Sequence, residues 1–106
     1  MPHQLQVIAH YYTLVDQTEL VACTLQSLAE ATRHEPGNIS YQFFQSRENP
    51  QHFVILERYR SENGLDVHRA TQHFQEIGIG IIAPLLERKE IESFLVADNH
   101  QQGACG

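Results

Sequence analysis

Apolar and polar positions follow two different spacings along this chain of 106 residues. Four short runs are rich in β-branched and aromatic side chains, a composition typical of strands: residues 5–15, 39–46, 52–60 and 91–97. The two middle runs are separated by a short turn with an Asn-Pro step, which predicts a β-hairpin. The first run has bulky side chains at odd and even positions alike, which predicts a strand covered on both faces.

The stretch after the first run has the spacing of an amphipathic helix. Its apolar side chains recur at i, i+4 and i+7, namely Val21, Leu25 and Leu28. Asp16 and Glu19 stand at the spacing of a capping box, which predicts the start of the helix here. The sequence Glu35-Pro36-Gly37 predicts its end, because proline cannot continue a helix and glycine can take a positive φ.

A second helical region precedes the last strand and is broken in two. Ser61 is suited to cap a short helix that covers about Asn63 to Ala70. Thr71 is suited to cap the next helix, and Pro84 lies near the end of that helix. The apolar stripe of this second helix consists of Phe74, Ile77, Ile81 and Leu85.

The resulting element order is β-α-β-β-α-β, which predicts an α+β, ferredoxin-like fold: an antiparallel sheet with helices on one face. We expect one domain over residues 1–98, because 106 residues leave no room for two, and a polar, flexible tail over residues 99–106. The helices would cover only one face of the sheet. We therefore expect a second copy of the chain to cover the other face, which makes a homodimer through the sheet faces.

Composition narrows the classes of partner. The chain has 7 basic and 13 acidic residues and a formal net charge of −6, which argues against a nucleic acid or an anionic membrane. Its first residues lack the regions of a signal peptide, and no apolar run approaches the length of a bilayer span. A disulfide between Cys23 and Cys105 is not expected, and two free thiols suit a reducing, cytoplasmic setting.

Three segments of the chain are similar, in their order, to segments of one known family. VIAHYYTLV (7–15) resembles its first strand, and EPGNISYQFFQS (35–46) resembles its E-x-G-[C/N]-x-x-Y/F loop and second strand. FVILERYRSENGLDVHRATQHF (53–74) resembles its next strand, which ends in Glu-x-Trp/Tyr and leads into a short helix with a His. Over about residues 5–97 the chain thus resembles the antibiotic biosynthesis monooxygenase (ABM) family, in particular its quinol-monooxygenase-like members. The resemblance implies a dimeric α+β barrel.

Members of this family include cofactor-free quinol-type monooxygenases, haem-degrading enzymes and the enzyme that processes phosphorylated autoinducer-2. The chain contains no Trp, and His68 stands where the antibiotic-pathway oxygenases and haem degraders carry one. Gly78 stands where haem degraders carry an iron-binding His, and Tyr11 stands where they carry an Asn. These departures disfavour haem degradation, so the resemblance implies an enzyme that works without a cofactor.

The resemblance points to His68 and His73 as catalytic residues. A histidine with a pKa near 6.5 is suited to remove a phenolic or enolic proton at neutral pH. Glu57 is a third catalytic candidate, because its carboxylate could orient a histidine by accepting its N–H. The substrate-binding candidates are the aromatic residues Tyr11, Tyr41 and Phe74.

Each candidate also has a purely structural explanation. His68 suits a core edge, Glu57 suits a structural ion pair, and Tyr11 suits sheet packing. His10 would face the side of the sheet opposite to Tyr11 and belong to the dimer interface. A metal site is not predicted, because His68 and His73 are five residues apart, whereas a helical pair on one face is four apart, and no Cys cluster accompanies them.

We expect a small oxygenase that oxidises a quinol or another electron-rich aromatic with O2, without bound metal or flavin. The first alternative is an isomerase that transfers a proton on a small carbonyl compound. The second is a non-catalytic dimer that binds a small ligand. His34 and His52, in a loop and at a strand edge, are expected to be solvated.

Overall fold

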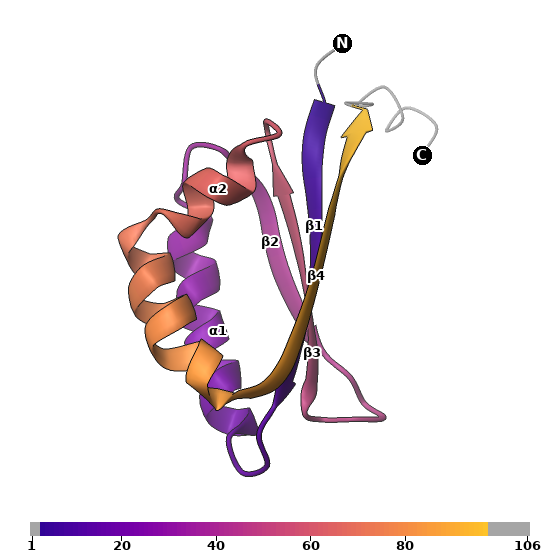
Figure 1. Cartoon of the computed structure of the whole chain (residues 1–106), viewed down its shortest axis with the longest axis vertical. Helices are drawn as coiled ribbons and strands as arrows, with labels where there is room; N and C mark the ends of the chain where they lie inside the picture. Colours follow the sequence, from indigo (N-terminus) through magenta and orange to yellow (C-terminus); the bar gives the residue numbers. More distant parts are fainter. Residues whose placement is uncertain (1–2, 98–106) are drawn as a thin grey trace.

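The computed structural model describes residues 3–97 and arranges them as a four-stranded antiparallel sheet with helices against one face (Figure 1). The elements in chain order are β1 (His3–Thr13), α1 (Thr18–Thr32), β2 (Asn38–Gln45), β3 (His52–Tyr59), α2 (Gly64–Arg69), η1 (Phe74–Ile82), η2 (Ala83–Leu85) and β4 (Leu86–Ala97). This is the predicted ferredoxin-like α+β fold. The tail predicted over residues 99–106 lies outside the described residues.

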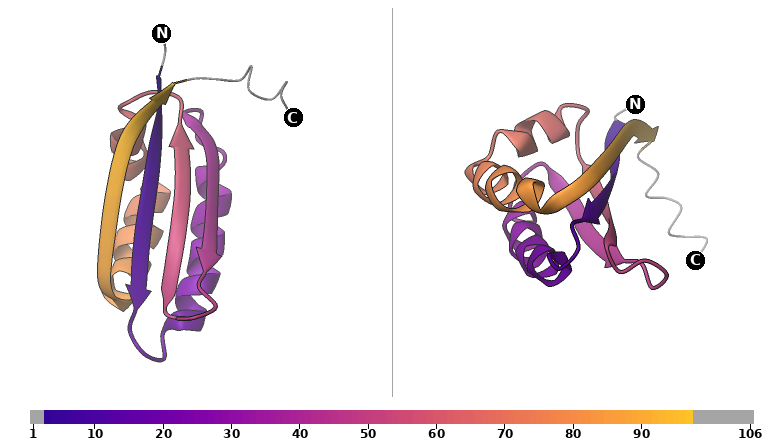
Figure 2. Two further views of the ribbon diagram at one scale, coloured as in Figure 1. Left: turned by 90° about the vertical axis from the view of Figure 1, so that its right-hand side faces the viewer. Right: turned by 60° about the horizontal axis from the view of Figure 1, so that its bottom comes forward.

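The sheet has the strand order β2-β3-β1-β4, so the first strand of the chain lies at its centre. The register pairs Val7 with Glu57 on β3, and Glu57 in turn with Tyr41 on β2. Because side chains alternate along a strand, the odd-numbered residues of β1 and β3 face the helices and the even-numbered ones face away. Figure 2 shows the second face of the sheet without any of the described helices over it.

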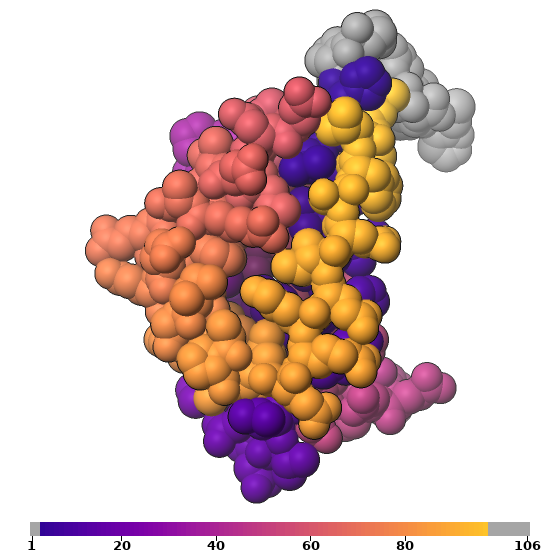
Figure 3. Space-filling model, viewed as in Figure 1, coloured from indigo at the N-terminus to yellow at the C-terminus, as the bar shows by residue number. Residues whose placement is uncertain are grey.

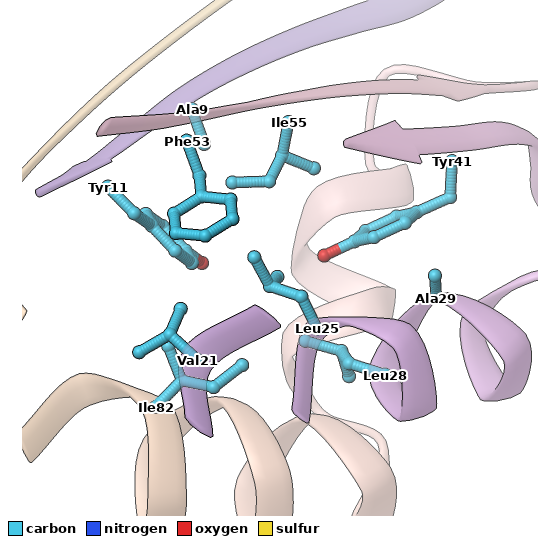
Figure 4. Packing of buried hydrophobic residues seen from close by; sticks show 10 residues of the cluster. All are labelled: Ala9, Tyr11, Val21, Leu25, Leu28, Ala29, Tyr41, Phe53, Ile55 and Ile82. Carbon is cyan, nitrogen blue, oxygen red and sulfur yellow. The ribbon is translucent and has the colours of Figure 1, made fainter. Parts of the chain in front are cut away.

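The core lies between α1, η1 and the inner face of the sheet (Figure 4). The predicted helical stripe is confirmed, since Val21, Leu25 and Leu28 are completely buried against the strands. Each buried leucine or valine contributes roughly 1.5–3 kcal/mol by leaving water. Phe53 and Ile55 meet this stripe from β3.

The boundaries of α1 differ from the prediction at both ends. Asp16 does not cap the helix; it adopts a left-handed conformation with φ of 75°, and the helix begins at Thr18 without a side-chain cap. The helix ends at Thr32, before the Glu-Pro-Gly sequence, and Gly37 has no positive φ. The chain is tied down after this end, because the guanidinium of Arg33 donates two hydrogen bonds to the Tyr41 carbonyl, at 3.0 and 2.8 Å.

The second helical region is broken as predicted, but its second part is not an α-helix. η1 is wound as a π-helix, a wider coil that is uncommon beyond a single turn and often found near functional sites. Thr71 caps this region as expected, because its hydroxyl accepts the N–H of Phe74 at 3.2 Å. Ser61 does not cap α2, since its hydroxyl bonds to the Asn63 side chain instead.

Strand β4 begins at Leu86, earlier than the predicted range of 91–97, and forms one edge of the sheet. The helices do not reach over it, and atoms of β1 are visible between α2 and β4 (Figure 3). Ile91 and Leu95, which pair with inner-face residues of β1, are consequently exposed, to 38% and 45%. Within residues 3–97, no helix combines the length and apolar character needed to cross a membrane.

Candidate active site

Three side chains from separate segments meet at one end of the helical layer. Nδ1 of His68 lies 2.8 Å from Oε2 of Glu35, and Nε2 of His73 lies 2.5 Å from the same oxygen. The side chain of His68 is 2% exposed, that of Glu35 9% and that of His73 24%. A single carboxylate oxygen therefore holds both predicted catalytic histidines, and only His73 reaches the surface to any extent.

The loop that carries Glu35 is fixed by backbone hydrogen bonds. The N–H of Asn38 donates to the Glu35 carbonyl at 3.0 Å and closes a tight turn around Pro36 and Gly37. The backbone and side chain of Arg60 donate to the carbonyls of Gly37 and Pro36, at 2.9 and 3.0 Å. The sequence that ends α1 thus also anchors Glu35 to the end of β3.

Helix α2 positions His68 by packing directly on β3. A Cβ added to Gly64 would lie 2.2 Å from the Cβ of Tyr59, so only glycine permits this close approach. Gly64 is the first residue of α2, and His68 lies one turn further along the same helix. The contact between Gly64 and Tyr59 therefore sets the depth at which His68 enters the core.

Thr71 joins the two helical segments and brings His73 next to His68. Its hydroxyl donates to the His68 carbonyl at 2.7 Å and accepts from the N–H of Phe74. This turn explains how two histidines five residues apart reach one carboxylate. The spacing rule for a continuous helix does not apply, because the chain changes direction between them.

The hydrogen-bond pattern defines the proton positions on His68. An ionised carboxylate only accepts hydrogen bonds, so Nδ1 of His68 and Nε2 of His73 are the donors to Glu35. Burial lowers the pKa of His68 below its ordinary value and so favours the neutral ring. The hydrogen bond and the charge of Glu35 act in the opposite direction, but burial has the larger effect. A neutral ring with its proton on Nδ1 keeps a free lone pair on Nε2, as a general base requires.

Aromatic side chains surround the His68 ring. The ring of Phe74 meets it edge-on at 5.0 Å between centroids, and those of Tyr59 and Tyr41 lie at 5.8 and 6.1 Å. Two of the three predicted substrate-binding residues, Tyr41 and Phe74, are therefore next to His68. Tyr59 is a neighbour that the sequence did not single out.

Glu57 is buried on the inner face of β3, but it does not orient a histidine. Its Oε1 accepts a hydrogen bond of 2.6 Å from the hydroxyl of Tyr59, and the role predicted for it is filled by Glu35. Burial raises the pKa of Glu57 to about 7, although the Tyr59 hydrogen bond and Arg69 act in the opposite direction. The chain thus buries a carboxyl group that titrates near neutral pH, close to the histidine cluster.

Tyr11 lies in the hydrophobic core, where burial and the neighbouring Glu57 raise its pKa. Among residues 3–97, the aromatic rings next to the His68 ring are those of Tyr41, Tyr59, His73 and Phe74, and Tyr11 is not one of them. Its ring packs in the core between the sheet and the helices. Its substrate-binding role stays a prediction.

A second group of histidines lies on the opposite face of the sheet. Nδ1 of His10 and Nε2 of His52 are 2.8 Å apart, and the His52 ring stacks on Tyr12 at 4.5 Å. The guanidinium carbon of Arg88 lies over the Tyr12 ring, 3.9 Å from its centre. His52, which was expected to be solvated, is partly buried in these contacts, whereas His34 is exposed as expected.

The structure has a hollow of about 140 Å3 on this second face, at the edge formed by β1 and β4. Its lining residues are His10, Glu90, Ile91 and Glu92. The hollow is open to solvent and lies on the side of the sheet away from Glu35 and His68. The hollow and the cluster of Glu35, His68 and His73 are thus on opposite sides of the sheet.

The donor atoms of Glu35, His68 and His73 lie within 4.8 Å of one another, so this cluster also has the composition of a metal site. The spacing of His68 and His73 alone did not indicate a metal site, because the third donor, Glu35, is far away in the sequence. The sequence offered one indication of Glu35: it is the one acidic residue in segment 35–46, which resembles the family. Its position next to histidines more than 30 residues away was not readable from spacing.

Comparison with known proteins gives a consistent set of relatives. Residues 5–78 match the family described as "Antibiotic biosynthesis monooxygenase". The chain is 28% identical to "Putative monooxygenase Rv0793" of Mycobacterium tuberculosis, over 82% of this chain and 97% of that protein. It is 38% identical to "Putative monooxygenase YcnE" of Bacillus subtilis, over 47% of this chain and 53% of that protein.

Solved structures agree with the sequence matches. The structure of Rv0793 superposes with a TM-score of 0.75 at 28% identity, over 90% of this chain and 94% of that chain. Protein SO0527 of Shewanella oneidensis gives a TM-score of 0.82 at 25% identity, over 91% and 93%. The likeness in fold therefore extends through β4, beyond the segment that the family match covers.

Proposed function

The chain belongs to the antibiotic biosynthesis monooxygenase family, and from this premise we propose that it is a cofactor-independent monooxygenase that oxidises a quinol or another electron-rich aromatic with O2. Its relatives in M. tuberculosis and B. subtilis carry the name monooxygenase, which supports the reaction class. The substrate class is our own addition. It rests on the acid–base chemistry of the site.

The observation that carries the proposal is the hydrogen bond from Nδ1 of His68 to Glu35. This bond keeps the lone pair of His68 on Nε2, in a ring that has three aromatic side chains as neighbours. Glu35 acts as the positioning residue, in the way that a buried carboxylate orients the base of a catalytic triad. His73 shares the carboxylate and lies at the more exposed edge of the cluster.

The proposed reaction begins when Nε2 of His68 takes the hydroxyl proton of a quinol. The resulting anion transfers electrons to O2, one oxygen atom forms a bond to a ring carbon, and the other leaves as water. A quinol plus O2 thus gives a hydroxylated quinone plus water. The substrate supplies all four electrons that reduce O2, so no reductant is needed.

Phe74 and Tyr41 are the proposed contacts of the aromatic substrate, because both rings lie beside His68. Stacking and edge-on contacts between aromatic rings contribute about 0.5–1.5 kcal/mol each beyond the area that they bury. Phe74 is only partly buried, at the start of η1. A displacement of this ring would open the route to His68.

Oxygen consumption with a panel of quinols tests the proposal. His68→Gln, which retains hydrogen-bonding capacity but offers no basic nitrogen, should lower turnover about 100-fold or more. His34→Gln is the matched control, since His34 is exposed and should leave turnover unchanged. Oxygen uptake by the His68→Gln variant at the rate of the unchanged protein would refute the role of His68.

The buried Glu57 favours one alternative, a proton-transfer isomerase. A carboxyl group with a pKa of about 7 can hold a proton that a neighbouring base has removed from a carbonyl compound. Turnover of such a compound at equal rates with and without O2 would select this alternative. Saturable ligand binding without any turnover would instead select the non-catalytic binder.

We propose that the outer face of the sheet pairs with a second copy of the chain. Ile8 and Leu56 are cross-strand neighbours in the middle of this face, and Phe44 and Phe94 are about half exposed near its margins. Light scattering should give twice the 12.1 kDa mass of the chain. Leu56→Glu should give the mass of one chain, whereas Val15→Glu, at an exposed position in the loop after β1, should not.

A further inference from the structure

We propose that Glu35, His68 and His73 also form a binding site for one divalent transition-metal ion of the iron-to-zinc series, and that the bound ion blocks the base. The binding itself depends only on the three side chains. The blocking effect rests on the function proposed above. The two parts are therefore tested by separate measurements.

The donor set matches the preferences of these ions. Two imidazole nitrogens and one carboxylate oxygen suit Fe2+, Co2+, Ni2+ and Zn2+, and leave positions open for water. The three donors come from the loop after α1, from α2 and from the residue before η1. The fold therefore gathers them independently of their separation along the chain.

The distances are close to those of a coordination site. Metal–nitrogen and metal–oxygen bonds of about 2.0–2.2 Å place tetrahedral ligand atoms roughly 3.3 Å apart. The separations of 2.8 and 2.5 Å between Glu35 and the two histidines must therefore widen by less than about 1 Å. His73 can supply this movement, because its ring is the most exposed of the three.

A metal ion at this position would change the tautomer of His68. In the hydrogen-bonded form, Nδ1 carries the proton and Nε2 carries the lone pair. A metal ion takes the lone pair of Nδ1, so the proton of the neutral ring moves to Nε2. His68 then has no free nitrogen with which to remove a substrate proton, and the proposed monooxygenase is inhibited.

The pair formed by His10 and His52 is the competing site on the same chain. Its nitrogens are also close, at 2.8 Å, and both rings are partly buried. No carboxylate joins these two histidines in a ligand cluster among residues 3–97. The comparison predicts that the ion prefers the buried cluster with its carboxylate.

Titration of the full-length, EDTA-treated protein with Co2+, followed by calorimetry and visible absorption, tests the binding. We expect one saturable site, with affinity at least roughly tenfold lower in Glu35→Gln and in His73→Ala. The double variant His10→Ala/His52→Ala is the control and should bind as the unchanged protein does. Circular dichroism spectra of all variants should coincide, which verifies that each one folds.

The outcomes separate the two proposals. Binding that persists in Glu35→Gln and His73→Ala but disappears in the double variant would overturn the site, as would the absence of saturable binding. Zn2+ should inhibit quinol oxidation reversibly, with full recovery after EDTA. Binding without inhibition would overturn the blocking effect alone. Specific binding to a protein that oxidises no quinol would support the metal site and count against the monooxygenase.

Discussion

The sheet separates two histidine pairs that differ in their hydrogen-bond partners and in their burial. On the inner face, His68 and His73 share one carboxylate oxygen and lie among buried aromatic rings. On the outer face, His10 and His52 bond to each other and stack with Tyr12 in partial contact with solvent. Both pairs have hydrogen bonds of 2.8 Å or less to the imidazole nitrogens, so distance alone does not distinguish them.

The two pairs differ in how their hydrogen-bond partners place the protons and lone pairs on the ring nitrogens. In the outer pair one ring must donate to the other, so one lone pair is consumed within the pair itself. In the inner cluster Glu35 accepts from both rings and leaves one nitrogen of each free. The outer pair therefore keeps one free lone pair, on the ring that donates, whereas the carboxylate of the inner cluster leaves one on each ring and fixes which nitrogen carries it.

The largest expected effect concerns the buried Glu57. Because burial raises its pKa to about 7, the folded state holds a proton that the unfolded state releases near pH 4.5. The resulting stability is complete below pH 4.5 and is lost as pH rises to about 7. The loss amounts to about 3 kcal/mol. Glu57→Gln, which stays neutral, should remove this loss and be more stable than the unchanged protein at pH 8.

Urea unfolding of both proteins between pH 4.5 and pH 8 measures this effect. Comparison with Glu57→Gln isolates it from His68, whose lowered pKa acts in the opposite direction, since its contribution is lost as pH falls below 6.5. Parallel stability curves for the two proteins would mean that Glu57 is already ionised in the fold at neutral pH. Among residues 3–97, the outer face contains no comparable buried acid to produce such a curve.

The next effect tests how tightly the inner region is built. Gly64→Ala should destabilise the fold by about 2 kcal/mol, because its new Cβ would collide with Tyr59 and displace α2. Gly37→Ala is the matched control, since a Cβ there meets nothing within 4 Å and the residue has no positive φ. Thermal or urea midpoints measure both. Equal midpoints for the two variants would show that α2 does not depend on this contact.

The smallest effect belongs to the outer pair. His52→Ala should lower stability by about 1 kcal/mol, the usual net contribution of one hydrogen bond between neutral groups. Quinol oxidation should stay within about threefold of the unchanged protein, whereas a substitution at His68 should lower it about 100-fold or more. Urea unfolding and oxygen uptake measure the two quantities. A loss of turnover as large as that of His68→Gln would place the active site on the outer face.

The sequence predicted the fold well because each element carries a local signal. Val21, Leu25 and Leu28 have helical spacing, and the tertiary structure buries the face that this spacing defines. The errors fall where local signals compete. Asp16 has the side chain of a helix cap, but the turn after β1 places it at φ of 75° instead. The apolar stripe from Phe74 onward does not distinguish a π-helix from an α-helix.

The site was predicted less completely because its decisive contact is long-range. The sequence singled out His68 and His73, but it assigned the orienting carboxylate to Glu57, which the strand places beside Tyr59. Glu35 was interpreted as part of a helix stop, but the helix ends earlier, at Thr32, and Glu35 begins the turn that follows. Only the packing of α2 over that turn makes Glu35 the partner of both histidines.

Heteronuclear NMR of the histidine side chains at pH 7.5 tests the central claim most directly, because it reports which ring nitrogen carries the proton. We predict that His68 is neutral with its proton on Nδ1 and its lone pair on Nε2, and that Glu35→Gln abolishes this preference. The opposite tautomer, with the proton of His68 on Nε2, would contradict the account, because Glu35 would then not prepare His68 to act as a base.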